Sequence, residues 1–428
     1  LFGESIHVVM EKPAQEGSIS SFGALMISTA SRVGTGNIVG VSTAICLGGP
    51  GAVFWMWVTA ILGGASAFVE STLAQVYKKR DPDGGSYGGP AYYIEDALHS
   101  RPLAIVFAVA LIFTYGVGYN MLASYNLQSA FAGFSFYDKS TTPAILGAII
   151  SLLFLYCMLG GGQRIVKITG VLVPIMGCLY VLMAVVALIL NLGNLGAMFG
   201  MIFSNAFDFK AIFGGFMGSC LMYGFKRGLY SNEAGIGSAP NAAAAADVSH
   251  PAKQGLVQML SVFIDTLLLC TATAFMCMCS GVTPAADLAG APYVQAALSA
   301  TFGSIGPVFI AVAMLLFAFT TLLGNFYYIE NCFAYILKKK PSKVFMNTVR
   351  VVGAVLIFLG AVVSFGFAWD MADICQCMLA FINIPSCVLL GGVAYRALDD
   401  YTAQKKEGKN PTYKAAANGV KEKTDFWT

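Results

Sequence analysis

The sequence of 428 residues has little charge and almost no histidine. Charged residues account for 11% of it and histidine for 3 positions, whereas hydrophobic residues account for 57%. A soluble domain needs about a quarter of its residues charged to cover its surface, so most of this surface must face hydrocarbon. The composition predicts an all-α integral membrane protein that has the lipid bilayer as partner, with no sign of nucleic-acid binding. It leaves the oligomeric state open.

Catalytic and metal-binding patterns are also missing. His7, His99 and His250 lie outside the apolar stretches, and the chain contains no His-Glu-x-x-His. An intramembrane enzyme is therefore a weak alternative. A channel is weak too, because motifs that form selectivity rings are lacking. Most of the 11 cysteines lie in apolar stretches without histidines nearby, which indicates small core residues rather than disulfides or a metal site.

Apolar stretches of about 18 residues or more predict transmembrane helices. The ten stretches are approximately 24–46, 52–77, 102–135, 143–160, 168–191, 211–232, 253–280, 305–337, 347–367 and 372–395. Lysine and arginine concentrate on the side that Leu1 would occupy, and the other side has just Lys139 and Lys210. Because cytoplasmic loops carry the positive excess, we predict ten spans with both termini in the cytoplasm.

The chain also contains an internal duplication at one offset of 195 residues. The matching pairs are Arg32 with Arg227, Asn37 with Asn232, Gly40 with Gly235, Ala44 with Ala239, and residues 66–71 with residues 261–266. Five spans separate the copies, and five is odd, so the two halves must be inverted. Inverted repeats are a transporter architecture with the site at the repeat interface. The predicted units are a cytoplasmic segment 1–23, a first repeat 24–192, a second repeat 193–395 and a polar, mobile cytoplasmic tail 396–428.

The first span is interrupted at Val33-Gly34-Thr35-Gly36-Asn37, where two glycines weaken the helix by about 1 kcal/mol each. Freed backbone groups within a membrane are tolerated only against protein or a water-filled cavity. The functional interpretation is a discontinuous helix whose N–H groups near Gly34 to Gly36 bind a carboxylate, helped by the dipole of the next half-helix. The alternative is glycine used for close helix packing.

Projected by 195 residues, the second interruption falls near Gly228 to Ser231. Carbonyl groups there would receive an ammonium group, and Phe225 and Leu229 would wall a side-chain pocket. A zwitterion with a short side chain suits such a site. Arg32 and Arg227 each lie beside a break, and intramembrane charges are costly and usually functional or paired. We predict a structural or gating role for them, with the acidic partners Glu70, Glu233 and Asp265.

The eighth span contains a candidate sodium site. The hydroxyls of Thr320 and Thr321 and the carbonyl of Phe317 lie on one helical face. Together with the carbonyls of Ala30 and Val33 they would supply five oxygen ligands. The alternative is that both threonines bond back to their own helix.

Three motifs resemble those of the alanine or glycine:cation symporters, the sodium:alanine symporter family. They are residues 48–63 (GGPGAVFWMWVTAILG), 34–38 (GTGNI) and 231–238 (SNEAGIGS). The resemblance covers nearly the whole chain. It implies a leucine-transporter-type fold with discontinuous first and sixth helices, and sodium-coupled uptake of alanine, glycine or a similar amino acid across a prokaryotic cytoplasmic membrane. Coupling to protons in place of sodium is an alternative within the same fold.

The resemblance also implies a set of contacts. Sodium would lie between Ala30, Val33, Thr320 and Thr321. Substrate contacts would fall on Thr35, Gly36, Phe225, Gly228 and Leu229 and on the third and eighth spans, where we expect Asn120, Ala123 and Asn325. Many relatives carry glutamine in place of Ala123 and tryptophan in place of Asn325. Asn120 and Asn325 would therefore suit a more polar side chain, such as that of serine or glutamine. Relatives usually have a further helix before the first one here.

Overall fold

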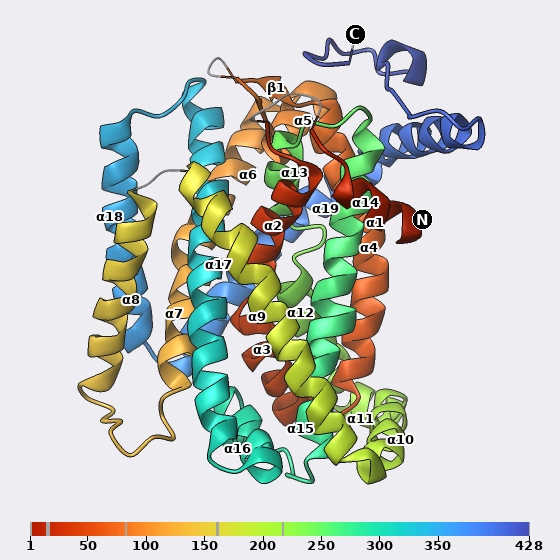
Figure 1. Cartoon of the computed structure of the whole chain (residues 1–428). Coiled ribbons are helices and arrows are strands. Elements are labelled where there is room, and N and C mark those ends of the chain that lie inside the picture. The colour runs from red at the N-terminus through yellow and green to blue at the C-terminus, as the bar shows by residue number, and fades with distance from the viewer. Residues whose placement is uncertain (1, 14–17, 82–83, 160–161, 216–217, 428) are drawn as a thin grey trace.

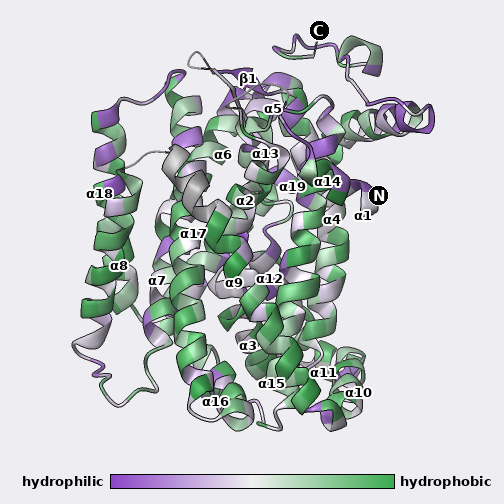
Figure 2. Ribbon diagram, viewed as in Figure 1, coloured by the Kyte–Doolittle hydropathy of each residue, from purple (hydrophilic) through white to green (hydrophobic). Residues whose placement is uncertain are grey.

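The computed structural model describes residues 2–13, 18–81, 84–159, 162–215 and 218–427. Long helices run side by side through the molecule (Figure 1), and a short hairpin of two strands lies at one end. Hydrophobic residues cover the sides of the helices, and hydrophilic residues gather at the ends (Figure 2). This distribution is that of a protein whose lateral surface contacts lipid.

The following bounds are observed, with η marking 3-10 or π-helical turns: α1 (Phe2–Met10), α2 (Ser21–Arg32), η1 (Thr35–Asn37), α3 (Val39–Thr43), η2 (Ala44–Gly48), α4 (Ala52–Val76), β1 (Lys79–Arg80), β2 (Ser86–Tyr87), α5 (Pro90–Leu98), α6 (Arg101–Phe113), η3 (Thr114–Gly118), α7 (Tyr119–Ser129), α8 (Thr142–Met158), α9 (Gly162–Leu190), η4 (Leu192–Asn194), α10 (Leu195–Ala206), α11 (Phe209–Gly214), α12 (Cys220–Asn232), α13 (Ala239–Ala245), α14 (Pro251–Val262), η6 (Phe263–Cys270), α15 (Thr271–Cys279), η7 (Ala286–Leu288), α16 (Ala291–Phe302), α17 (Ile305–Leu337), α18 (Lys343–Val362), α19 (Phe365–Lys406) and η8 (Ala416–Asn418).

Within the described residues, seven helical stretches are long and apolar enough to cross a membrane. They coincide with the predicted second, third, fifth, seventh, eighth, ninth and tenth spans. The fourth prediction corresponds to the shorter α8, and its final residue, Gly160, lies outside the described residues. The first and sixth predictions each correspond to two or more short helices, and residues 216–217 of the sixth are also outside the description.

The helices pack in two groups. In the first, α4 packs against α12, α13 and α14, and α2 packs against α13 and α14. In the second, α18 packs against α7 and α8, and α17 packs against α7. The α18 and α8 pair lies at one side of the molecule and the α4 and α14 pair at the other (Figure 1). Helix α17 also contacts α2, so the two groups meet where the first span is interrupted.

The last helix extends beyond the predicted span of 372–395 at both ends, because α19 runs from Phe365 to Lys406. The buried side chains of Ala397 and Tyr401 hold this extension against the rest of the chain. Residues 411–427 then turn back, and they lie at the end of the molecule that also carries α1, α5 and the strands (Figure 1). We call this end the tail face and residues 411–427 the C-terminal strap.

Candidate functional site

The first interruption lies between α2 and α3. Helix α2 ends at Arg32, Gly34 has an extended backbone (φ −138°, ψ −156°), and a 3-10 turn follows over Thr35–Asn37. The Gly34 amide donates a hydrogen bond to Asn37 Oδ1 at 2.9 Å. Helix α2 therefore ends just before the first of the two glycines.

The glycines at this break also permit close approach. A Cβ on Gly34 would lie 2.2 Å from Thr321 Oγ1 of α17, and one on Gly36 would lie 2.8 Å from the Tyr230 ring of α12. Packing, the alternative interpretation of these glycines, is therefore present together with the interruption. The break brings the first span within contact of both the eighth and the sixth.

A cavity lies beside this break, toward the end opposite the tail face. It has a volume of about 430 Å³, and Val39, Asn126, Lys139, Asp287 and Phe365 are among the residues that line it. Asn126 of α7 also donates a hydrogen bond through Nδ2 to Thr35 Oγ1 at 3.0 Å. One lining residue of the cavity therefore contacts the residue that follows Gly34.

The second interruption lies later than predicted. Helix α12 continues unbroken through Gly228 and Ser231 to Asn232, so the projection to Gly228–Ser231 is wrong. The chain leaves the helix at Glu233, whose φ is 51°, and Gly235 and Gly237 have φ values of 82° and 87°. Glycine adopts such values without steric cost. Gly228 serves packing instead, because a Cβ there would lie 3.0 Å from Thr59 of α4.

A buried carboxylate stabilises the second interruption. Glu70 of α4, fully buried, accepts hydrogen bonds from the backbone amides of Gly235 at 3.2 Å and Gly237 at 3.1 Å. Asn383 of α19 donates to the same carboxylate through Nδ2 at 2.8 Å and to the Gly235 carbonyl at 2.9 Å. These bonds satisfy amides that the broken helix leaves free.

A second buried carboxylate connects the first interruption to α12. Asn37 donates through Nδ2 to Asp265 Oδ1 at 2.8 Å, and the Ser231 and Thr266 hydroxyls donate to Asp265 Oδ2 at 2.5 and 2.9 Å. Asp265 is fully buried in a π-helical stretch between α14 and α15. Of the residues predicted near the second break, Ser231 is the one that reaches the first.

The two carboxylates occupy equivalent positions in the duplication, because Glu70 and Asp265 are 195 residues apart. Glu70 of the first copy contacts the interrupted helix of the second, whereas Asp265 of the second copy contacts the interrupted helix of the first. The contacts are therefore reciprocal between the two copies.

The predicted residues on the third and eighth spans form a polar chain beside the first break. Ser31 donates to Asn325 Oδ1 at 2.7 Å, and Asn325 Nδ2 donates to Asn120 Oδ1 at 2.8 Å. Both asparagines are fully buried, as is Ala123. Within the described part of the chain, Asn120 Nδ2 and Ser124 Oγ have no hydrogen-bond partner.

Two predicted residues of α12 lie away from this centre. The Phe225 ring stacks on Trp55, 6.0 Å between centroids, and its side chain is among the exposed ones. Leu229 is half-buried, and its carbonyl accepts the amide of Glu233. The structure does not bring Phe225 to the residues of the first interruption.

The candidate sodium ligands divide into two environments. Thr321 Oγ1 donates to the Ser31 carbonyl at 3.4 Å, so it faces the end of α2 that contains Ala30 and Val33. Thr320 Oγ1 instead lies 3.0 Å from the Leu316 carbonyl and 3.1 Å from the Phe317 carbonyl. The alternative of back-bonding to the same helix thus describes Thr320 as it stands, whereas Thr321 bridges two helices.

The two arginines differ despite their equivalent positions. Arg32 is buried and donates to the Gln258 carbonyl at 3.4 Å. Arg227 forms an ion pair with Asp373 of α19 at 2.8 Å, and its guanidinium lies 4.0 Å from the centre of the Trp369 ring. The predicted partners Glu70, Glu233 and Asp265 therefore do not pair with Arg227. Trp369 contacts Phe365, which lines the cavity, so the Arg227 pair lies on the cavity side.

Sequence reasoning missed several residues of the centre. Tyr230 packs on Gly36 and edge-on to Tyr119, 5.0 Å between centroids. Asn126 contacts Thr35, and Asp373 pairs with Arg227. A polar residue within an apolar stretch was the available signal for Asn126 and Asp373, whereas nothing in the sequence distinguishes Tyr230 from other aromatic residues.

The tail face is closed by contrast. Ile19, just before α2, forms a bridge with Ala246, and its carbonyl accepts the Asp247 amide at 2.9 Å. The Gln254 amide group donates to Ser21 Oγ at 3.0 Å. A buried polar centre with a cavity beside it at one end and closed contacts at the other is typical of a multi-pass membrane transporter.

The particular family follows from comparison with known proteins. The sequence model described as the sodium:alanine symporter family matches residues 1–415, so the chain belongs to that family. Its members are transporters and not enzymes, and their co-transported ion is sodium. This confirms the resemblance found in the sequence motifs and sets the intramembrane enzyme aside.

Individual relatives are similar to this chain over most of its length. The chain is 44% identical to the amino-acid carrier protein AlsT of Bacillus subtilis over 97% of its own length and 87% of that protein. It is 42% identical to the probable sodium/glutamine symporter GlnT of the same organism, over 96% and 84%. Among solved structures, MhsT in complex with L-phenylalanine superposes with a TM-score of 0.63 at 16% identity, covering 89% of this chain and 90% of that one. At this low sequence identity, the similarity to MhsT supports the fold alone.

Proposed function

We propose that this carrier imports a small neutral amino acid, such as alanine or glycine, together with sodium by alternating access. It would cross the cytoplasmic membrane ten times, as two inverted repeats of five spans with discontinuous first and sixth helices and both termini in the cytoplasm. The observation that carries the proposal is the pair of interruptions, joined through Asn37, Ser231 and Asp265, with a cavity beside the first one.

The substrate carboxylate would bind at the first interruption, at Gly34, Thr35 and Gly36. A helix N-terminus attracts an anion, and Asn126 of the cavity lining contacts Thr35. For Gly34 to take part, its amide must leave the Asn37 side chain to which it now donates. The ammonium group would lie near Ser231 and the end of α12, where backbone carbonyls and Asp265 supply negative charge. The Arg227 and Asp373 pair, which ties α12 to α19 on the cavity side, would act as the gate there.

Sodium would bind between α2 and α17, with the carbonyls of Ala30 and Val33 and the Thr321 hydroxyl as ligands. For Thr320 to take part, its hydroxyl must turn away from the carbonyls of Leu316 and Phe317. The ion would then join the two helix groups at the point where they meet, so that its binding and release are linked to the motion of one group against the other.

The polar chain of Ser31, Asn325 and Asn120 favours a second substrate class. Leaving buried donors unpaired costs about 1–3 kcal/mol per group, and within the described residues Asn120 Nδ2 and Ser124 Oγ are unpaired. A serine, asparagine or glutamine side chain would supply the missing acceptor, and alanine would not. GlnT, the relative named as a probable glutamine symporter, makes this class worth testing beside alanine.

The experiment is uptake of labelled amino acids into proteoliposomes under a sodium gradient alone, with the pH equal on both sides. Accumulation of alanine, serine or glutamine under these conditions is expected. A failure to accumulate any of them would refute sodium coupling. Accumulation driven instead by a pH gradient would support the proton alternative, for which Asp265 is the nearest candidate carboxylate to the first interruption.

A further inference from the structure

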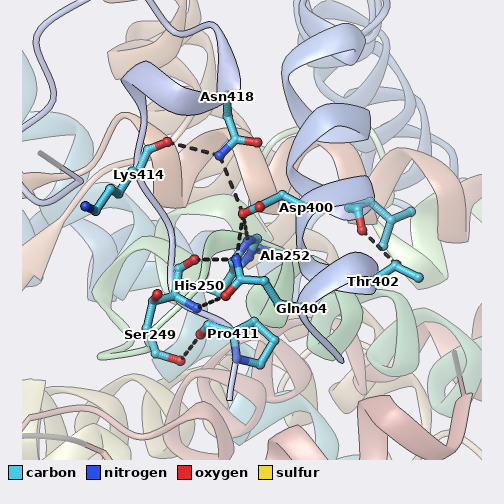
Figure 3. Close-up of polar contacts among 11 residues, drawn as sticks. Ser249, His250, Ala252, Asp400, Thr402, Gln404, Pro411, Lys414 and Asn418 are labelled. Carbon is cyan, nitrogen blue, oxygen red and sulfur yellow. Dashed lines mark hydrogen bonds and ion pairs between the residues drawn. The ribbon is translucent and has the colours of Figure 1, made fainter. Parts of the chain in front are cut away.

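The C-terminal strap is attached to three separate elements of the tail face. Ser249, just before α14, donates through its hydroxyl to the Pro411 carbonyl at 2.8 Å. Gln404 of α19 exchanges two hydrogen bonds with the Thr412 backbone, at 2.8 and 3.0 Å. Figure 3 shows these contacts around Asp400, which accepts from the Gln404 amide at 3.0 Å. The strap therefore spans from α19 to the start of α14.

The far end of the strap is seated on the end of α4. Trp427 is buried, and its indole Nε1 donates to the Gln75 carbonyl at 2.6 Å. Phe426 lies beneath two cations, with Lys78 Nζ and the Arg80 guanidinium each 4.6 Å from the centre of its ring. Lys78 is buried whereas Arg80 is exposed, so the Lys78 contact is the stronger of the two, because a cation held out of water is attracted more strongly to a ring.

The backbone of the strap reinforces this seat. Arg80 donates through Nε and Nη2 to the Asp425 carbonyl at 3.1 and 2.9 Å, and the Arg80 amide donates to Asp425 Oδ2 at 3.2 Å. The Ala415 amide donates to the Trp427 carbonyl at 2.9 Å, so the strap closes on itself. The seat is thus specific for both the aromatic pair and the residue before it.

The seat touches both interrupted helices. Gln75, which holds Trp427, donates through its amide group to the carbonyls of Ala243 and Ala246 at the end of α13. Lys78 donates to the same Ala246 carbonyl at 3.0 Å. Ala246 in turn pairs with Ile19 ahead of α2. Burial lowers the pKa of Lys78 to about 8, so the cation on the Phe426 face is held out of water.

An aromatic column links the two attachments. The Tyr413 ring lies edge-on to Trp427, with centroids 5.7 Å apart, and to His250, with centroids 5.0 Å apart. His250 caps α14 by accepting the Ala252 amide at its Nδ1, 3.1 Å away, and lies 3.2 Å from Asp400 Oδ2 of α19. The strap is therefore packed along its length and not only at its ends.

We propose that the C-terminal strap is an intramolecular latch, with the Phe426–Trp427 pair as its key, that holds the tail face closed and slows opening of the transport pathway on that side. Opening there must separate α13 and the start of α2 from their neighbours. The strap holds α4, α14 and α19 together beside these contacts, and Gln75 and Lys78 of its seat bond to the end of α13. The latch goes beyond the proposed function, although its consequence for uptake rests on alternating access.

Binding of the strap can be tested without transport. The variant lacking residues 411–428 is purified, and a synthetic peptide of that segment is titrated into it by calorimetry. We expect saturable binding of the parent peptide. A peptide with Trp427→Ala should bind with an affinity at least about fivefold lower, which corresponds to about 1 kcal/mol. A Lys414→Ala peptide is the matched control, because this exposed lysine lies on the same segment. Equal binding of the Trp427→Ala peptide would refute the seat.

Opening of the tail face is measured by alkylation of native cysteines. Cys332 and Cys387 are buried, and the rates at which they are alkylated are compared between variants. Mass spectrometry should show Cys332 and Cys387 reacting about fivefold faster in Trp427→Ala than in Lys414→Ala, together with a faster initial rate of amino-acid uptake. Unchanged alkylation would overturn the latch. Changed alkylation without uptake by any variant would uphold the latch and count against the proposed function.

A cross-linked variant covers the case in which the shortened chain fails to fold. Cysteines in place of Ser249 and Pro411 would join the strap to the start of α14. The two residues are in contact, because the Ser249 hydroxyl lies 2.8 Å from the Pro411 carbonyl oxygen. Oxidation should slow uptake and the alkylation of Cys332, and a reductant should restore both. If the oxidised protein transports as fast as the protein treated with reductant, the strap need not release for transport.

Discussion

The Gly34→Ala substitution tests whether the contact between the first and eighth spans is the sodium site. The backbone at Gly34 is extended and suits alanine, so the whole effect comes from the new methyl group. Its carbon would lie 2.2 Å from Thr321 Oγ1, far inside ordinary contact. Forcing extra volume into a packed interior costs about 1–3 kcal/mol. Since Thr321 must turn away, we expect sodium affinity to fall by about 5–150-fold, the same free energy expressed as a binding ratio.

Two further variants separate packing from ion binding. In Gly34→Ala with Thr321→Ala, the clashing oxygen is gone and the remaining neighbours lie at 3.4 Å or more, so folding stability should recover while sodium affinity does not. Gly40→Ala is the matched control, because its methyl group would meet nothing closer than 3.8 Å. The assay is sodium-dependent thermal stabilisation and substrate binding in detergent. Gly34→Ala with normal sodium affinity would refute the assignment of Thr321 to the ion site.

Three shorter predictions concern other parts of the chain. Thr320→Ala with Thr321→Ala should weaken sodium binding and, by linkage, substrate binding; unchanged sodium dependence would remove both hydroxyls from the site. Glu70→Gln should lower stability by about 1–3 kcal/mol, because the charged acceptor of two backbone amides is lost; an unaltered melting temperature would contradict this. Burial lowers the pKa of His250 from 6.5 to about 4. Between these pH values the unfolded chain therefore binds more protons than the folded one. The free energy of unfolding should fall by up to about 3 kcal/mol as the pH drops from 6.5 to 4. His250→Gln should flatten this part of the stability profile, and a profile like that of the parent protein would exclude His250 as its cause.

The sequence predicted the helical membrane architecture because that architecture depends on local composition. Long apolar runs have no stable alternative to helices in lipid. The end of α2 also has a local cause, because Gly34 and Gly36 lie close together and each weakens the helix. The position of the second break was not accessible in this way, because a glycine in a helix serves either packing or bending. Gly228 packs on Thr59, and only the contacts of Gly235 and Gly237 with Glu70 reveal the bend.

The C-terminal strap escaped prediction for a related reason. Its composition is polar and rich in lysine, which is typical of mobile tails. The signal against mobility was the Phe426–Trp427 pair, since two adjacent large aromatic residues are seldom left in water. Their seat, however, is made by residues about 350 positions earlier in the chain. No local pattern connects segments that far apart, so the docking emerges only from the folded structure.

The contacts of Glu70 and Asp265, equivalent residues of the two copies, indicate different roles for the two interruptions. Glu70 binds backbone amides directly and so fixes the shape of the second interruption. Asp265 is held by the side chains of Asn37, Ser231 and Thr266, which can exchange partners without moving the backbone. Because a carboxylate held by hydroxyls and an amide can accept a cation or a proton with little rearrangement, the first interruption is the adaptable one. Ligand-dependent change should therefore begin between α2 and α3, with the second interruption as the fixed reference against which they move.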